Sequence, residues 1–162
     1  MCCIVKAISP KLIKKNEGWK VFESGFDGNL YSLFYSDKPL RTNEWMDEFH
    51  YRLDSCKHPF YLERYLDRAS RTVVHYSPGW HIFMTKKGAE EYGKFILLRY
   101  SELRPAKGLM VAMKVRFKGI KLACKFTVPN MDELPPKNHY YRGVVAEKLY
   151  IPEDSEKFLV LT

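Results

Sequence analysis

Apolar and cationic residues alternate through much of the segment from Lys114 to Phe126, and this alternation limits the folds open to the chain more than any other feature. Lys114, Arg116 and Lys118 fall on one face of an extended strand, because successive side chains of a strand point to opposite faces. Gly119 interrupts the pattern, which then resumes. We therefore predict a β-hairpin whose two turn residues are Lys118 and Gly119. In that register the cross-strand partners are Phe117 with Ile120, Arg116 with Lys121, and Val115 with Leu122.

A longer segment that includes most of this region, Lys94 to Lys125, carries the whole excess of positive charge in the chain. Between Lys94 and Lys125, nine lysine and arginine side chains stand against one acid, Glu102, and the whole chain has a net charge of +8. Like charges placed opposite each other in a sheet cost stability, so a surface that tolerates them suggests an anionic partner. An ordinary solvated face is the alternative, because lysines on edge strands also prevent sheets from aggregating.

Length and composition indicate one globular domain. A chain of 162 residues with 46% hydrophobic residues can bury a substantial core. Cys2, Cys3, Cys56 and Cys124 lack the spacing of a disulfide framework, so we expect reduced thiols and a cytoplasmic location. No apolar run is long enough for a transmembrane helix and no signal peptide is visible, so we expect no membrane partner. The sequence leaves the oligomeric state open.

Local patterns predict an α+β fold, a single domain with a curved, mainly antiparallel sheet and one or two packed helices. Strands are expected at residues 2–8, 19–23, 30–35, 72–76, 80–84, 140–151 and 158–161. A helix is expected after Thr85, with Ala89, Tyr92 and Ile96 on its apolar face. Residues 36–70 are predicted to form a helical insert or flap, with Asn43 as its first N-cap.

A candidate ligand pocket is predicted where the strand at 80–84 leads into this helix. His81 would donate to a phosphate, while the free backbone N–H groups, Lys86 and Lys87 would attract an anion. The alternative is a satisfied, partly buried His81 beside two solvated lysines. Together with the basic hairpin, the predicted ligand-binding residues are Trp80, His81, Lys86, Lys87, Tyr92, Lys114, Arg116, Lys121 and Tyr140. In this hypothesis His81 and Arg116 bond phosphate oxygens, the lysines supply positive field, and one aromatic ring stacks on a base.

Several short motifs resemble a group of small uncharacterised proteins of bacteriophages and their bacterial hosts. These motifs are Gly79-Trp80-His81-Ile82-Phe83 with the following Ala89 and Tyr92, the Met1-Cys2-Cys3-Ile4-Val5 opening, and residues 28–32 and 143–151. The resemblance implies an accessory protein directed against host defence, in the cytoplasm of a bacterial host. A phage-encoded sponge that sequesters a nucleotide signal of the host fits this expectation.

Two enzyme classes are alternatives. The strand with His81 and the helix with Tyr92 are similar to the nucleotide cleft of ADP-ribosyltransferase-like folds, where Glu147 would supply the acid. The Met-Cys-Cys opening resembles N-terminal-nucleophile amidotransferases, in which Cys2 attacks once Met1 is removed. For this opening, small buried residues on a first strand are the other interpretation.

No metal or cofactor is expected. The spacing of His50, Cys56 and His58 fits no usual zinc site, and His75 and His81 lack a third ligand. We therefore expect non-enzymatic binding of an anionic, nucleotide-like small molecule. A nucleic-acid-binding or host-protein-inhibiting module is the first alternative, and an ADP-ribosyltransferase-like nucleotide enzyme is the second.

Overall fold

The computed structural model describes residues 4–33, 38–100 and 108–161. The strands in these ranges are β1 (Ile4–Ala7), β2 (Glu17–Gly25), β3 (Leu30–Ser32), β4 (Trp45–Asp47), β5 (Glu63–Asp67), β6 (Thr72–Tyr76), β7 (Trp80–Phe83), β8 (Gly108–Asn130), β9 (Lys137–Tyr150) and β10 (Lys157–Leu159). The α-helix α1 spans Lys86–Tyr100, and 3-10 helices span Pro10–Leu12, Glu48–Tyr51 and Asp54–Cys56. No helix in the described ranges is long and apolar enough to cross a membrane. An antiparallel sheet with one described α-helix confirms the predicted α+β class.

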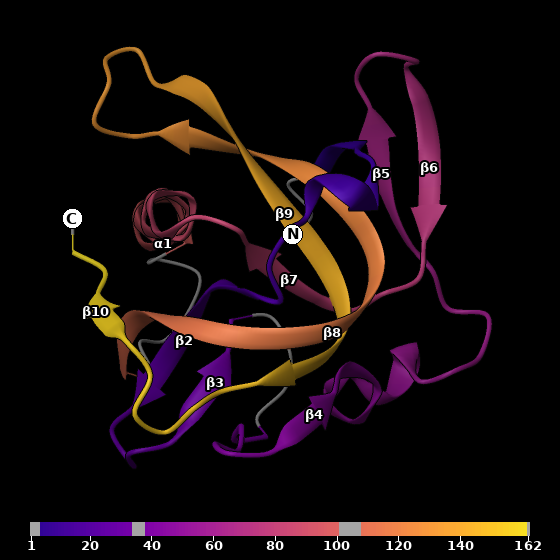
Figure 1. The fold of residues 1–162 in the computed structure, drawn as a ribbon. Helices are drawn as coiled ribbons and strands as arrows, with labels where there is room; N and C mark the ends of the chain where they lie inside the picture. Colours follow the sequence, from indigo (N-terminus) through magenta and orange to yellow (C-terminus); the bar gives the residue numbers. More distant parts are fainter. Residues whose placement is uncertain (1–3, 34–37, 101–107, 162) are drawn as a thin grey trace.

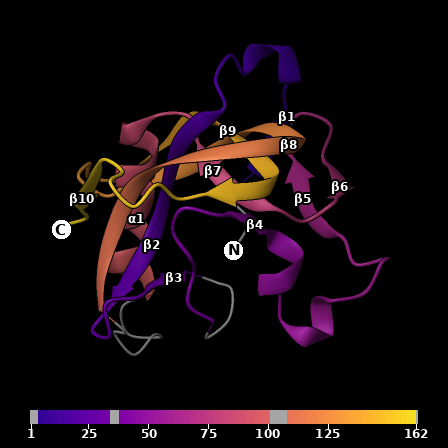
Figure 2. The ribbon, with the colours of Figure 1, turned by 60° about the horizontal axis from the view of Figure 1, so that its bottom comes forward.

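The main sheet closes on itself. Its strand order is β1-β8-β2-β7-β9-β4, with β3 added to β2 and β10 to β8, and all the pairs are antiparallel. Because β8 also pairs with β9, the strands β8, β2, β7 and β9 form a ring of hydrogen-bonded neighbours. In Figure 1, β8 bends like the letter C and α1 lies on its concave side. The separate β5–β6 hairpin stands beside the bend of β8, away from α1, in Figures 1 and 2.

Each face of the main sheet is covered by an apolar core. Core 1 lies on the side of α1, where Ala89 and Ile96 pack with both halves of β8, represented by Met110 and Phe126. Core 2 lies on the opposite face and includes Trp80, beneath the segment that contains β4. Successive residues of β7 alternate between the two cores, as do Met110 to Met113 at the start of β8, which explains why these segments are apolar on both faces.

The predicted hairpin turn at Lys118 and Gly119 is wrong, because β8 continues through both residues. Phe117 pairs with Leu149 of β9 rather than with a residue of its own strand. Arg116 likewise lies between β2 and β9 instead of opposite Lys121. The chain reverses only after Asn130, the last residue of β8.

Gly119 marks the bend of β8 rather than a reversal of the chain. Its φ is +72°, a left-handed conformation that glycine adopts without steric cost. The register between β8 and β9 shifts just beyond it, between Ile120 and Leu122. An extra residue in one strand of a pair bends that strand and increases its twist. A turn and a bend therefore share the same sequence signal, and pairing with β9 selects the bend.

Residues 36–70, predicted to form a helical insert or flap, contain no α-helix in the part that the structure describes. Asn43 has a φ of +59° and its side-chain amide donates to Glu153 Oε2 at 2.9 Å, so it does not cap an α-helix. Short 3-10 helices follow, and β5 occupies the region of the second predicted helix. There Tyr65 is buried between the exposed Arg64 and Leu66, which is the alternation of a strand.

The other predicted elements agree with the structure. The backbone N–H of Gly88 donates to Thr85 Oγ1 at 3.1 Å, which confirms Thr85 as the start of α1. The predicted strands are present as β1 to β3, β6, β7, β9 and β10, with ends that differ by a few residues. Cys56 and Cys124 are free thiols, as expected, whereas Cys2 and Cys3 lie outside the described residues.

Replacing Gly119 with alanine should destabilise the protein more than the same change at Gly28. Both glycines have positive φ, so each substitution costs about 1 kcal/mol of left-handed strain. A Cβ at Gly119 would also lie 2.8 Å from Glu147 Cβ, whereas one at Gly28 meets nothing within 4 Å. We expect the free energy of unfolding to fall by about 3 kcal/mol for Gly119→Ala, measured by urea denaturation. Equal losses for the two variants would contradict the bend described here.

Candidate functional site

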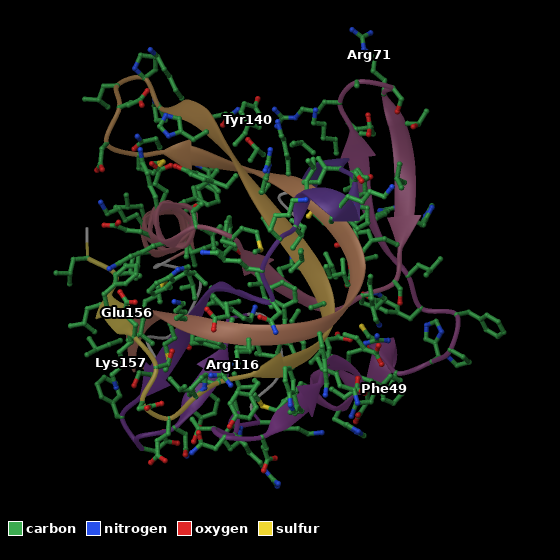
Figure 3. All side chains as sticks on the ribbon, viewed as in Figure 1. Phe49, Arg71, Arg116, Tyr140, Glu156 and Lys157 are labelled. Atoms are coloured by element: carbon green, nitrogen blue, oxygen red, sulfur yellow. The ribbon has the colours of Figure 1, made fainter. Side chains whose placement is uncertain are left out.

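Exposed and half-buried cations and aromatic rings gather on one face of β4, β9 and β8, which we call the cationic sheet face. Its members are Trp45 on β4, Lys148 and Tyr150 on β9, and Lys114, Arg116 and Lys118 on β8. These strands are adjacent, because Trp45 pairs with Tyr150, and Tyr150 pairs with Arg116. The intervening residues Val115, Phe117 and Leu149 point to the other side and are buried in core 2. Arg116 is labelled on this part of the sheet in Figure 3.

The cations of this face contact its aromatic rings. Lys118 Nζ lies 4.2 Å from the centroid of the Trp45 ring, and Arg116 Cζ lies 5.8 Å from that of Tyr150. The two rings are 5.3 Å apart and tilted by 50°. Trp45 remains 40% exposed. A cation over an aromatic face is favourable, so these contacts hold both kinds of group in place at the surface.

Acidic side chains neutralise this face only in part. Glu17 lies 3.5 Å from Lys114 Nζ and 4.0 Å from Arg116 Nε. Such exposed pairs contribute little stability and leave the cations accessible. Lys118 faces Lys148 directly across β8 and β9, and Asp47 of β4 stands opposite Lys148 on the other side, but neither lysine forms an ion pair within the described part of the chain. Two like charges opposite each other are a cost that an anionic ligand would relieve.

A basic groove of about 570 Å³ adjoins the cationic sheet face. Its volume lies within the usual range of small-ligand sites, about 300–1,000 Å³. Lys14 and Lys15 line it from the segment before β2, and Lys118 lines it from β8. Gly119 and Ile120 contribute its wall, so the bend of β8 shapes it. Three lysines around one groove make it a second place where an anion would be attracted.

His81 does not lie on the cationic sheet face. Its ring packs 5.7 Å from the Phe126 ring in core 1, and its Nε2 is 3.3 Å from the Tyr76 hydroxyl. Burial, together with the charge of Lys20, lowers the pKa of His81 from 6.5 to about 3. The ring is therefore neutral at pH 7 and contributes no positive charge to phosphate binding. This placement fits the alternative of a satisfied, partly buried histidine.

The predicted aromatic partners lie in three separate places. Trp80, one of the three candidates for the stacking ring, is fully buried and its Nε1 donates to Met46 O at 3.2 Å, so its ring is not accessible to a base. Tyr92 packs its ring 5.3 Å from that of Phe83 on the side of α1. Tyr140 is exposed at the far end of β9, where its hydroxyl accepts a hydrogen bond from Arg68 (Figure 3).

The predicted lysines are also dispersed. Lys86 pairs with Glu156 at 3.5 Å, and Lys87 lies 4.0 Å from Glu91. Lys121 donates to Pro78 O at 2.8 Å. The predicted ligand-binding residues therefore do not converge on one pocket, and only Lys114 and Arg116 belong to the cationic sheet face.

Sequence reasoning missed a buried ionic cluster beneath β4. Arg52 Nε donates to Glu48 Oε2 at 2.6 Å, and the two side chains are 7% and 1% exposed. Burial raises the pKa of Glu48, although Arg52 opposes this. Lys20 donates to His81 O at 3.1 Å, and burial lowers its pKa to about 8. A lysine two positions from Phe22 was the available signal, because the two side chains share one face of the strand.

The remaining catalytic alternatives gain no geometric support. Glu147 lies on β9 against Gly119, while His81 and Tyr92 contact other partners in core 1. Cys2 lies outside the described residues. Among the described side chains, no group of three or more His, Cys, Asp or Glu has the arrangement of a metal site.

Acid should destabilise the protein through His81. The folded-state pKa of about 3 lies below the unfolded value of 6.5, so the unfolded state binds an extra proton between these pH values. This contribution to stability is present above pH 6.5 and disappears as the pH falls toward 3. Relative to His81→Phe, the wild type should lose about 2 kcal/mol between pH 7 and pH 4.5 in urea unfolding. An NMR titration in which the His81 ring protonates near pH 6 would contradict this assignment.

Comparison of the chain with protein-family models, with curated proteins and with solved structures found no match. The resemblance to small phage and bacterial proteins remains an expectation from sequence motifs.

Proposed function

We propose that the cationic sheet face binds single-stranded nucleic acid. The proposal rests on one row of side chains: Trp45, Tyr150 and Arg116 lie side by side on three adjacent strands. Lys118 and Lys148 lie beside this row. Single-strand binding proteins combine aromatic rings that stack on bases with cations that follow the backbone. Sheet surfaces with exposed aromatic residues are a common platform for this recognition in RNA-binding domains.

A nucleotide-like small molecule in the basic groove is the second candidate. The groove of about 570 Å³ is lined by Lys14, Lys15 and Lys118, and it opens beside the aromatic rings of the face. This candidate agrees with the expectation from the sequence that the protein binds an anionic small molecule, such as a nucleotide signal of the host. Because Lys118 belongs to both proposed sites, replacing it cannot distinguish the two ligands. The stoichiometry of binding and its dependence on salt concentration can.

The double variant Arg116→Gln/Lys118→Gln should bind a fluorescent oligothymidine at least about tenfold more weakly at 0.1 M salt, because it removes two phosphate partners. The slope of log affinity against log salt should become shallower by about 1.4. Arg71→Gln/Arg99→Gln, which removes the same charge from the β5–β6 tip and α1, is the matched control. If both variants weaken binding equally, the effect is one of net charge and the face is not the site.

Trp45→Ala tests base stacking. It should weaken oligothymidine binding by about tenfold, because stacking of one base contributes about 1–3 kcal/mol, and it should leave the salt slope unchanged. The measurement is fluorescence anisotropy across a salt series. Saturation by one nucleoside monophosphate per protomer, with a shallow salt slope, would instead favour the groove. Unaltered oligonucleotide affinity in this variant would argue against a role for the ring.

A further inference from the structure

A second cavity lies between β1, the β5–β6 hairpin and the second half of β8. Its volume is about 400 Å³, within the usual range of small-ligand sites. The apolar part of its wall consists of Ile4, Val5, Tyr65, Leu66 and Val73. Figure 3 shows this end of the molecule, marked by Arg71 and Tyr140, well apart from Arg116. The cavity is therefore distinct from the cationic sheet face.

The hairpin presents an apolar pair between two arginines. Leu66 on β5 pairs with Val73 on β6, and these side chains are 57% and 55% exposed. Arg64 and Arg68 also line the cavity. Side chains two positions apart on an extended strand share a face, which puts Arg64 on the same side of β5 as Leu66, with Arg68 following just after the strand.

The two arginines are poorly neutralised. Arg64 forms no ion pair within the described part of the chain. Arg68 donates to the Tyr140 hydroxyl at 3.4 Å, which is a long contact with an uncharged group. By contrast, Arg52 and Lys86 have acidic partners. A guanidinium without an acid is suited to binding the carboxylate of a ligand, because its planar donors match the two oxygens.

We propose that this cavity binds a small amphipathic ligand, an apolar chain that ends in a carboxylate. The apolar chain lies on Leu66 and Val73, against Ile4 and Val5 of β1, and the carboxylate accepts hydrogen bonds from Arg64 or Arg68. Burying the exposed apolar surface supplies the affinity, and the arginines select a charged head group over a neutral one. A free fatty acid and the C-terminal residue of a peptide both have this chemistry.

The test is a titration of protein labelled at the Ile, Leu and Val methyl groups with octanoate, followed by NMR. Octanoate should shift the methyl signals of Leu66, Val73, Ile4 and Val5, and octan-1-ol should bind about tenfold more weakly. Arg64→Gln/Arg68→Gln should reduce octanoate affinity by about tenfold, because a hydrogen bond to a charged group contributes about 1.5–3 kcal/mol. The two arginines are exposed, so the methyl spectrum of the free variant should otherwise match that of the wild type.

Arg71→Gln, which neutralises an arginine at the tip of the same hairpin, is the matched control and should bind octanoate normally. Arg116→Gln/Lys118→Gln should also bind it normally, which separates this cavity from the proposed nucleic-acid face. N-acetyl-leucine serves as the second probe: tighter binding of N-acetyl-leucine favours a peptide terminus, and tighter binding of octanoate favours a fatty acid. Equal affinity for octanoate and octan-1-ol, or no shift at these methyl groups with either acid, would overturn the proposal.

Discussion

The bend of β8 at Gly119 is the constraint on which the rest of the fold depends. The first half of β8 pairs with β2 and β10, and the second half pairs with β9 and β1. β8 therefore closes the ring, because it pairs with β2 through its first half and with β9 through its second half. The helix α1 packs on the concave side of its bend. A strand of 23 residues without such a bend would leave core 1 open on the side where Met110 and Phe126 now pack together.

Most of the local structure could be predicted from the sequence, and the errors have a common cause. Alternation around β7 and the cap at Thr85 gave the right elements, because these signals act within a few residues. The turn predicted at Gly119 was wrong because a left-handed glycine occurs both in hairpin turns and in bends of a continuous strand. Only the pairing of β8 with β9 on both sides of Gly119 shows that the strand continues. Residues 61–69 misled because apolar spacing there fits a helix, while pairing with β6 imposes a strand.

The candidate site was harder to predict than the fold. Arg116 and Lys114 were identified through their charge, and both lie on the cationic sheet face. Trp45 and Tyr150 are about a hundred positions apart and become neighbours only because β4 adds to the edge of β9. His81 was predicted as a ligand-binding residue because of its motif, but the motif does not show whether other side chains bury that face of the strand. Here Phe126, a residue of distant β8, covers it.

The pairing of β1 has a consequence for synthesis on the ribosome. Ile4 and Ala7 find their hydrogen-bonding partners at Phe126 and Cys124, near the other end of the chain. Contacts of such long sequence separation form late and slow the folding of a domain. β1 must therefore wait, without its sheet partner, until the second half of β8 has been made. A chaperone that shields emerging apolar segments would find a binding site in β1 during this interval.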